Sequence, residues 1–347
     1  MQNYLYPWQY LAWESLQKLR DRLPHAILLY GAAGTGKSEF ASLLAQSLLC
    51  ELPATNGQPC TACASCGWFV QYSHPDFRRV RPEALDDDEA GDGDGDGNTE
   101  AETKKVVKSS KTPSKDIRIE QVRALANFMH LSTHRNGHRV VLLYPAESLN
   151  TASANALLKT LEEPPPRTVI LLVSNRIDRL LPTVLSRCRK FAMPTPVRAE
   201  ALSWLQAQQV ADADVWLDAQ GGAPLAALAQ SQAGGRAELD AFLEQLAHPG
   251  SDTALVMAEK FQKYPMPDVV SWMQRWLYDM FSCKMTGRIR FYPRYRRQLT
   301  VLAARAEVHA LMAGLQGVVQ RRAIAEHPLA PKLFIEDMLL EYAQIFP

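Results

Sequence analysis

Residues 31–38 have the types and order of a phosphate-binding loop. They read GAAGTGKS, a full match to the pattern G-x-x-x-x-G-K-[ST], and they directly follow a short hydrophobic run. In such a loop the glycines let the backbone wrap around a phosphate, and the next helix presents its N–H groups to it. The residues expected to contact nucleotide and magnesium are Gly31, Gly34, Thr35, Gly36, Lys37 and Ser38. A glycine-rich turn without a ligand is the alternative interpretation.

The residues that would activate water for ATP hydrolysis are missing from their usual place. Hydrolysis needs an acidic residue at the end of a neighbouring strand to hold magnesium, usually beside a glutamate that orients the water. After the candidate strand, residues 140–143, come Tyr144 and Pro145. Glu147 lies too far along the chain to serve unless the strand is shifted, and that alternative stays open. We therefore expect passive nucleotide binding and no turnover by the chain itself.

Four of the six cysteines lie close together in the sequence. Cys50, Cys60, Cys63 and Cys66 have the spacing C-x9-C-x2-C-x2-C, among polar turn residues. Two consecutive C-x-x-C turns bring thiolates within reach of one tetrahedral ion, and four sulfur ligands complete a closed structural zinc site. A buried set of free thiols is the alternative. Cys188 and Cys283 are expected to be ordinary buried thiols.

Two further segments carry polar groups suited to phosphate chemistry. Ser174 and Asn175 are expected at a strand end facing the phosphate loop, and Arg187 follows in the triplet Ser-Arg-Cys. An arginine at the surface there can stabilise charge on a phosphoryl group held by a neighbouring subunit. Residues 288–297 interleave five arginines with aromatic residues, a composition that suits a nucleic-acid contact or a protein interface equally well.

Three hydrophobic runs indicate an α/β domain in the first part of the chain. Residues 26–30, 140–144 and 169–173 are uniformly apolar, as central strands of a parallel sheet are when helices cover both faces. Helical patterns lie between them at 38–49, 117–131 and 151–162. This alternation predicts a phosphate-loop domain over residues 1–195, ending near Pro194 and Pro196.

The remainder of the chain lacks strand signals. It is rich in alanine, leucine and glutamine at helical spacing, and glycine pairs interrupt it. We expect a small helical domain over residues 196–245 and a second helical domain over residues 246–347.

Charge is distributed unevenly along the 347 residues. The net charge of +1 excludes binding to nucleic acid by bulk positive charge alone. Residues 83–115 carry ten acidic and five basic side chains, and we expect a disordered loop there. Asp92, Asp94 and Asp96 resemble part of a calcium-binding loop, but Thr103 occupies the position of the required glutamate. Without a signal peptide or a long apolar span, the expected location is cytoplasmic.

Taken together, the phosphate loop, the cysteine insertion and two later motifs resemble the clamp-loader AAA+ ATPases of bacterial DNA polymerase III. The later motifs are NALLKTLEEPPP, residues 155–166, and LPTVLSRCRKF, residues 181–191. The resemblance covers most of residues 1–195 apart from the acidic loop. It continues more weakly through GGAPLAAL, residues 221–228. It implies a phosphate-loop domain, a helical lid and a C-terminal helical collar through which five subunits assemble.

The resemblance also implies roles for individual residues. In that family the Ser-Arg-Cys arginine, here Arg187, acts on the ATP of an adjacent subunit, and four cysteines hold zinc. The tau/gamma motor subunits carry an Asp-Glu pair where this chain has Tyr144 and Pro145. They also offer a lid arginine where Pro224 and Leu225 stand here.

The expected function is that of a non-hydrolysing clamp-loader subunit in DNA replication. It would assemble with tau/gamma and delta subunits in a hetero-pentamer that loads the sliding clamp onto primed DNA with ATP. Zinc is the expected structural cofactor, and binding of ATP with magnesium stays open. The alternatives are an active motor of the tau/gamma type that uses Glu147, and a zinc-containing DNA-binding adaptor.

Overall fold

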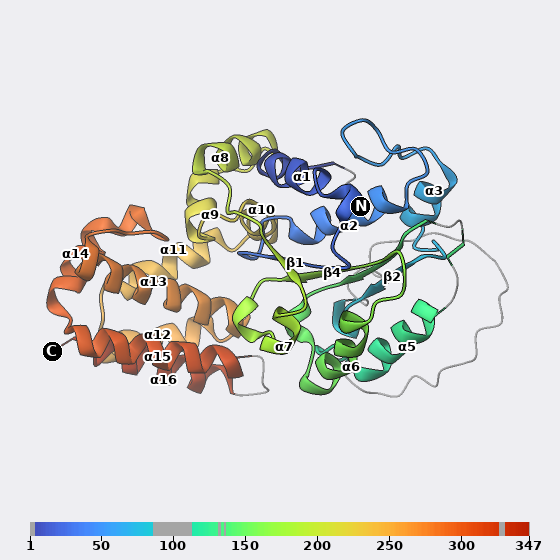
Figure 1. The fold of residues 1–347 in the computed structure, drawn as a ribbon. Helices are drawn as coiled ribbons and strands as arrows, with labels where there is room; N and C mark the ends of the chain where they lie inside the picture. The colour runs from blue at the N-terminus through green and yellow to red at the C-terminus, as the bar shows by residue number, and fades with distance from the viewer. Residues whose placement is uncertain (1–3, 86–112, 131–132, 135–136, 326–329, 347) are drawn as a thin grey trace, which may run out of the picture. The chain divides into compact units, whose positions relative to one another are not determined.

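The computed structural model describes residues 4–85, 113–130, 133–134, 137–325 and 330–346. The chain divides into two compact units, residues 1–196 and 197–347, which are described separately (Figure 1). Most of the acidic loop expected at 83–115, including Asp92, Asp94 and Asp96 of the possible calcium-binding loop, lies outside the described residues.

The first unit combines a parallel sheet with helices on both faces. Its elements, in chain order, are η1 (Pro7–Gln9), α1 (Tyr10–Gln17), η2 (Arg20–Arg22), β1 (Ala26–Tyr30), α2 (Lys37–Leu49), α3 (Ala64–Val70), β2 (Phe77–Val80), α5 (Ile119–His130), β3 (Arg139–Leu143), η3 (Ala146–Ser148), α6 (Thr151–Glu162), β4 (Thr168–Ser174), η4 (Ile177–Arg179), α7 (Pro182–Leu185) and β5 (Arg189–Ala192), where η denotes a 3₁₀ helix.

The sheet has the order β2-β3-β4-β1-β5, and every neighbouring pair is parallel. The expected α/β fold with a parallel sheet is confirmed, and the three predicted strands are its central members. The sequence patterns missed the two edge strands, β2 and β5. This order puts the carboxyl end of β1 between those of β4 and β5, so residues that follow these strands gather at one edge.

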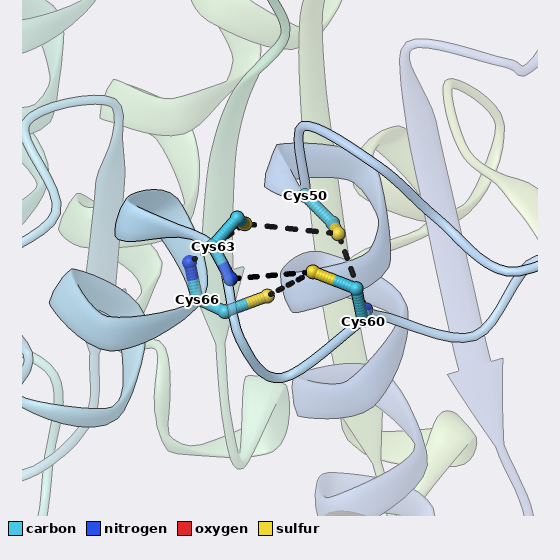
Figure 2. A group of neighbouring side chains, drawn as sticks. All are labelled: Cys50, Cys60, Cys63 and Cys66. Atoms are coloured by element: carbon cyan, nitrogen blue, oxygen red, sulfur yellow. Dashed lines mark hydrogen bonds between the residues drawn. The ribbon is translucent and has the colours of Figure 1, made fainter.

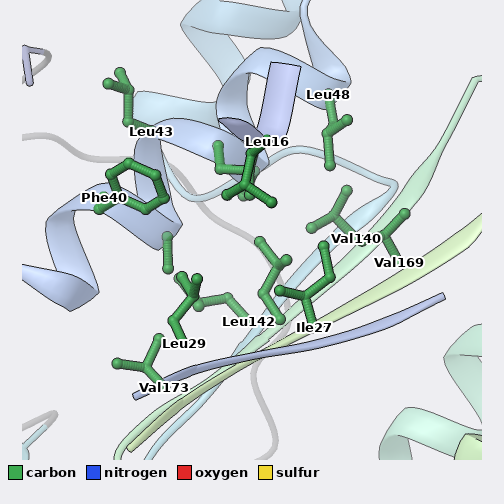
Figure 3. Packing of buried hydrophobic residues seen from close by; sticks show 14 of the residues in the cluster. Leu16, Ile27, Leu29, Phe40, Leu43, Leu48, Val140, Leu142, Val169 and Val173 are labelled. Atoms are coloured by element: carbon green, nitrogen blue, oxygen red, sulfur yellow. The ribbon is translucent and has the colours of Figure 1, made fainter. Parts of the chain in front are cut away.

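Each central strand supplies side chains to two hydrophobic cores, which explains why the runs are uniformly apolar. Ile27 and Leu29 of β1 point to the core beneath α1 and α2, where Phe40 packs (Figure 3). Ala26 and Leu28 point to the opposite core, formed with α5, α6 and α7. Burial on both faces fixes the strand register, because a one-residue slip would exchange the two sets of side chains.

The second unit is helical throughout its described residues. Its elements are α8 (Arg198–Ala207), α9 (Ala213–Ala219), α10 (Pro224–Ala233), α11 (Arg236–Leu246), α12 (Ser251–Phe261), α13 (Met266–Thr286), η5 (Pro293–Tyr295), α14 (Arg296–Arg305), α15 (Val308–Ile324) and α16 (Pro331–Ala343). None of the described helices is both long enough and apolar enough to cross a membrane.

Buried polar contacts join segments far apart within this unit. The indole N–H of Trp276 donates to the Tyr342 hydroxyl at 2.9 Å, and that hydroxyl donates to the carbonyl of Leu246 at 2.7 Å. These bonds connect α13, α16 and the end of α11. The subdivision into a lid and a collar at residue 245 stays a prediction.

Asp279 is a fully buried carboxylate that organises the turn before η5. Its oxygens accept the backbone N–H groups of Arg290, Phe291 and Tyr292 at 2.7–3.2 Å. Burial raises the pKa of Asp279, while these three donors oppose the rise. The carboxylate thus satisfies three backbone N–H groups of a partly buried turn, among them that of the buried Tyr292.

We expect Asp279→Ala to lower the free energy of unfolding by about 2–4 kcal/mol, because it leaves three backbone N–H donors unpaired, one of them buried. Urea unfolding of the full chain measures this. Asp337→Asn is the matched control, since Asp337 is exposed and pairs with Arg321 on the surface. It should change stability by less than about 1 kcal/mol. Equal effects of the two substitutions would contradict the structural role of Asp279.

Candidate functional site

The phosphate loop connects the carboxyl end of β1 to the first turn of α2. Gly36 caps the helix in the left-handed conformation, with φ of 82°. A Cβ at Gly36 would lie 2.6 Å from the Tyr6 ring, and one at Gly31 would collide with the carbonyl oxygen of Met193. Glycine is required at both positions because atoms from outside the loop leave no room for a Cβ.

Lys37 and Ser38 lie at the first turn of α2, where an outer phosphate and a magnesium ion would be bound. Lys37 is buried, its ammonium donates to the Ala32 carbonyl at 2.5 Å, and burial lowers its pKa to about 8. The carboxylates of Glu147 and Glu39 oppose this lowering. The hydroxyl of Ser38 donates to Glu39 at 2.9 Å. Lys37 therefore points into its own loop and stays mainly protonated at neutral pH.

Two residues near the N-terminus support the loop from outside, and the sequence patterns did not reveal them. The Gln9 amide donates to the carbonyls of Thr35 and Gly36 at 3.2 and 2.7 Å. The indole N–H of Trp8 donates to the same Thr35 carbonyl at 2.9 Å. Both donors bond carbonyl oxygens, so these contacts occupy none of the loop's N–H groups.

β3 ends at Leu143, so Tyr144 and Pro145 directly follow the strand, in the register expected from the sequence. The ring of Tyr144 packs against the core beneath α2, and its hydroxyl accepts a hydrogen bond from Arg81 at 3.3 Å. Glu147, however, lies closer to the loop than its distance along the chain suggested. Its carboxylate accepts the N–H of Asn175, just after β4, at 3.0 Å. Glu147 lies within η3, which follows β3 closely and brings this carboxylate back to the same edge of the sheet.

The four cysteines converge between the end of α2 and the start of α3 (Figure 2). Their sulfur atoms all lie within 4.8 Å of one another, and the Cys50–Cys63 and Cys60–Cys66 pairs are each 4.0 Å apart. Sulfurs at about 2.3 Å from a tetrahedral zinc ion would be separated by about 3.8 Å. The arrangement therefore has the dimensions of a Cys₄ metal site.

Backbone N–H groups surround these sulfurs. The N–H of Cys60 donates to the sulfur of Cys50, and the N–H of Cys63 donates to the sulfur of Cys60, each at 3.3 Å. The N–H of Cys66 donates to the sulfur of Cys63 at 3.4 Å. Bonds from Ala62 and Cys63 lower the pKa of Cys60 to about 6, whereas burial raises the pKa of Cys50 and Cys66. Of the other two cysteines, Cys188 is buried as expected, whereas Cys283 is partly exposed.

Arg187 lies between α7 and β5 and is partly exposed. Its guanidinium forms an ion pair with Glu162, the last residue of α6. It also donates to the Thr183 carbonyl at 2.9 Å and to the Ser186 hydroxyl at 3.3 Å. The sequence placed Arg187 at the surface but gave no sign of its partner on α6.

Two of the five arginines in segment 288–297 have partners within the second unit, whereas Arg288, Arg296 and Arg297 are exposed. Arg290 donates to the carbonyl of Gly221 at 3.1 Å, and Arg294 pairs with Asp212 and Asp214. Tyr292 is buried. These contacts give the segment an internal role, which neither of the two sequence-based interpretations included.

Comparison with known proteins identifies the family. A family model described as DNA polymerase III, delta subunit matches residues 9–196. The DNA polymerase III subunit delta' of Pseudomonas aeruginosa is 35% identical over 288 residues, which cover 81% of this chain and 79% of the relative. The chain belongs to the delta' family of DNA polymerase III subunits. The delta' subunit of Haemophilus influenzae is 29% identical, over 81% of this chain and 78% of the relative.

The match to the family contains every predicted site residue. The phosphate loop, the four cysteines and Arg187 all lie between residues 9 and 196. A gamma subunit-related protein of DNA polymerase III from Thermotoga maritima covers 96% of the chain and is itself covered to 99%. It has 16% identity and a TM-score of 0.44, too low to add to the assignment to the delta' family.

Proposed function

We propose that this chain is a clamp-loader subunit that supplies Arg187 to ATP bound by an adjacent subunit and does not hydrolyse ATP itself. Membership of the delta' family supports the clamp-loader role. Two features of this chain together support the proposal that it assists a neighbour's ATP site and does not hydrolyse ATP itself. Arg187 is partly exposed beside the sheet, whereas Tyr144 and Pro145 stand where a motor needs acidic residues.

Family membership implies other clamp-loader subunits as partners. In the proposed assembly these are tau/gamma and delta subunits in a hetero-pentamer, which loads the sliding clamp onto primed DNA. The proposed location is the cytoplasm, where this replication function would be carried out. The chain's contribution is to position a neighbour's reaction, because an arginine placed in trans stabilises charge on the transferring phosphoryl group.

For the four cysteines we infer a structural zinc ion. The mutual sulfur distances fit tetrahedral coordination, and four sulfur ligands leave no open position for a substrate. Bound there, the ion would connect the end of α2 to the start of α3. This cross-link would stabilise the segment that follows the nucleotide-binding helix.

The residues of the phosphate loop also fit a nucleotide. Lys37 and the loop's N–H groups would hold the phosphates, and Ser38 the magnesium ion. The close packing of Tyr6 and Gln9 on Gly36 supports a loop held in shape before a ligand arrives. The N-terminal end of α2 and the ammonium of Lys37 would offset the negative charge of the bound phosphates, and the proposed role of the site is passive.

The isolated chain is expected to show no steady-state ATP turnover, because no acidic residue directly follows β3. Turnover of purified protein at saturating MgATP, with and without primed DNA, tests this. A rate above about one per second, within the usual range of enzymes, would contradict the passive site.

A motor that uses Glu147 is the second candidate, and one observation favours it. The Glu147 carboxylate lies at the carboxyl end of β4, and its charge acts on Lys37. Glu147→Gln distinguishes the two functions in the reconstituted complex. Under our proposal turnover is unchanged, whereas a motor would lose the turnover of its own site.

The DNA-binding adaptor predicts salt-sensitive binding of DNA to the isolated chain. The internal contacts of Arg290 and Arg294 weigh against it, because these side chains already have partners. Tight binding at low salt that weakens steeply with added salt would support the adaptor.

A further inference from the structure

The contact between Glu162 and Arg187 joins two residues that lie 25 positions apart in the sequence, each in its own motif. Glu162 ends α6, in the motif NALLKTLEEPPP, and Arg187 follows α7. The side chains of Arg187 and Glu162 are 33% and 48% exposed. An exposed ion pair adds little stability, so its principal effect is on the orientation of the arginine.

Glu162 occupies a position that is unfavourable for an acidic residue considered alone. The C-terminal end of a helix carries partial negative charge, which favours cations and disfavours carboxylates. Lys159 is a basic residue in the same last turn, but the carboxylate of Glu162 pairs with Arg187 of the adjoining segment. The guanidinium thus offsets the repulsion between Glu162 and the end of α6.

The guanidinium of Arg187 has enough N–H donors to be held in place by this chain and still bind a phosphate. A guanidinium has five N–H donors in one plane. Nη1 faces the Thr183 carbonyl and the Ser186 hydroxyl, and Nη2 faces Glu162. Among the described residues nothing bonds Nε, and Nη2 retains a second N–H. These two donors can reach an oxyanion while the other contacts persist.

We propose that Glu162 is a positioning residue for Arg187, fixing the plane of the guanidinium so that its free edge is presented to a phosphate held by a neighbouring subunit. This inference rests on the proposed role of Arg187. Glu162 acts through the arginine and does not itself touch the nucleotide. Its loss would leave the arginine charged and present but free to rotate, which lowers the rate of the chemical step more than the affinity for ATP.

The test is a double-mutant cycle in the reconstituted clamp loader, read as DNA-stimulated ATP turnover. Glu162→Ala should remove most of the turnover that Arg187→Ala removes, with an unchanged KM for ATP. Glu162→Gln keeps an oxygen acceptor and should give an intermediate loss. In the Arg187→Ala background, Glu162→Ala should have no further effect, because the two residues act as a unit.

Glu163→Ala is the matched control, since Glu163 is the adjacent exposed residue at the end of α6. It should retain full turnover. Gel filtration checks that each variant assembles, and Glu162→Gln keeps the test valid if the alanine variant does not fold.

The possible failures are distinguishable. If Arg187→Ala lowers turnover while both Glu162 variants retain it, only the positioning role is wrong. Additive losses, or turnover raised by Glu162→Ala, would also overturn that role. If Arg187→Ala has no effect, the proposed function itself fails, and the positioning role fails with it.

Discussion

Arg187→Ala should abolish nearly all ATP turnover at the one site that this residue serves in a reconstituted clamp loader. Removing an arginine supplied in trans lowers the rate by about 10³ to 10⁵ where the effect is measured. The complex would then retain only the turnover that its other sites support. The substitution affects no core packing, since Arg187 is partly exposed, so assembly and thermal stability should be unchanged.

Two companion variants strengthen this experiment. Arg187→Lys keeps the charge but loses the planar fork of donors, so we expect little recovery of turnover. Arg189→Ala removes an exposed arginine from β5, two positions along, and should leave turnover intact. Normal turnover by Arg187→Ala would remove the residue from the mechanism.

Substitution of a single cysteine of the cluster should release zinc and destabilise the first unit. Cys66 is buried, and its sulfur lies 4.0 Å from that of Cys60. Structural zinc contributes about 10–16 kcal/mol in small zinc-dependent domains. In a larger domain with its own cores we expect Cys66→Ser to cost about 3 kcal/mol or more, which lowers Tm by roughly 10 °C.

The measurements are the zinc content of purified protein and its thermal unfolding. The wild-type chain should carry one zinc ion, and Cys66→Ser should carry much less than one. Cys283→Ser is the matched control, because Cys283 lies outside the cluster and is partly exposed. It should keep both zinc and Tm. Wild-type protein that contains no zinc when purified without chelators would contradict the metal site.

The strands that could be predicted from the sequence are those whose composition reflects their burial. The central strands β1, β3 and β4 are buried on both faces, so their composition alone marks them. The edge strands β2 and β5 carry charged side chains and have only one neighbouring strand. Their strand conformation depends on pairing with β3 and β1, and a short polar run does not indicate such a pairing.

The candidate site was predictable in its local motifs and missed in its supporting contacts. The phosphate loop and the cysteines are short sequence patterns whose geometry is set by adjacent residues. Gln9 contacts the loop from 26 positions away, and Glu147 and Glu162 reach their partners only through tertiary packing. No periodicity or spacing connects such pairs, so the fold was needed to find them.

The central claim is that this chain assists a neighbour's ATP site and does not run its own. One comparison tests it most directly: DNA-stimulated turnover of the reconstituted complex with Lys37→Met or with Arg187→Ala in this subunit alone. Our account predicts that Lys37→Met keeps full turnover and that Arg187→Ala loses the turnover of one site. The reverse result, loss with Lys37→Met and full turnover with Arg187→Ala, would contradict it.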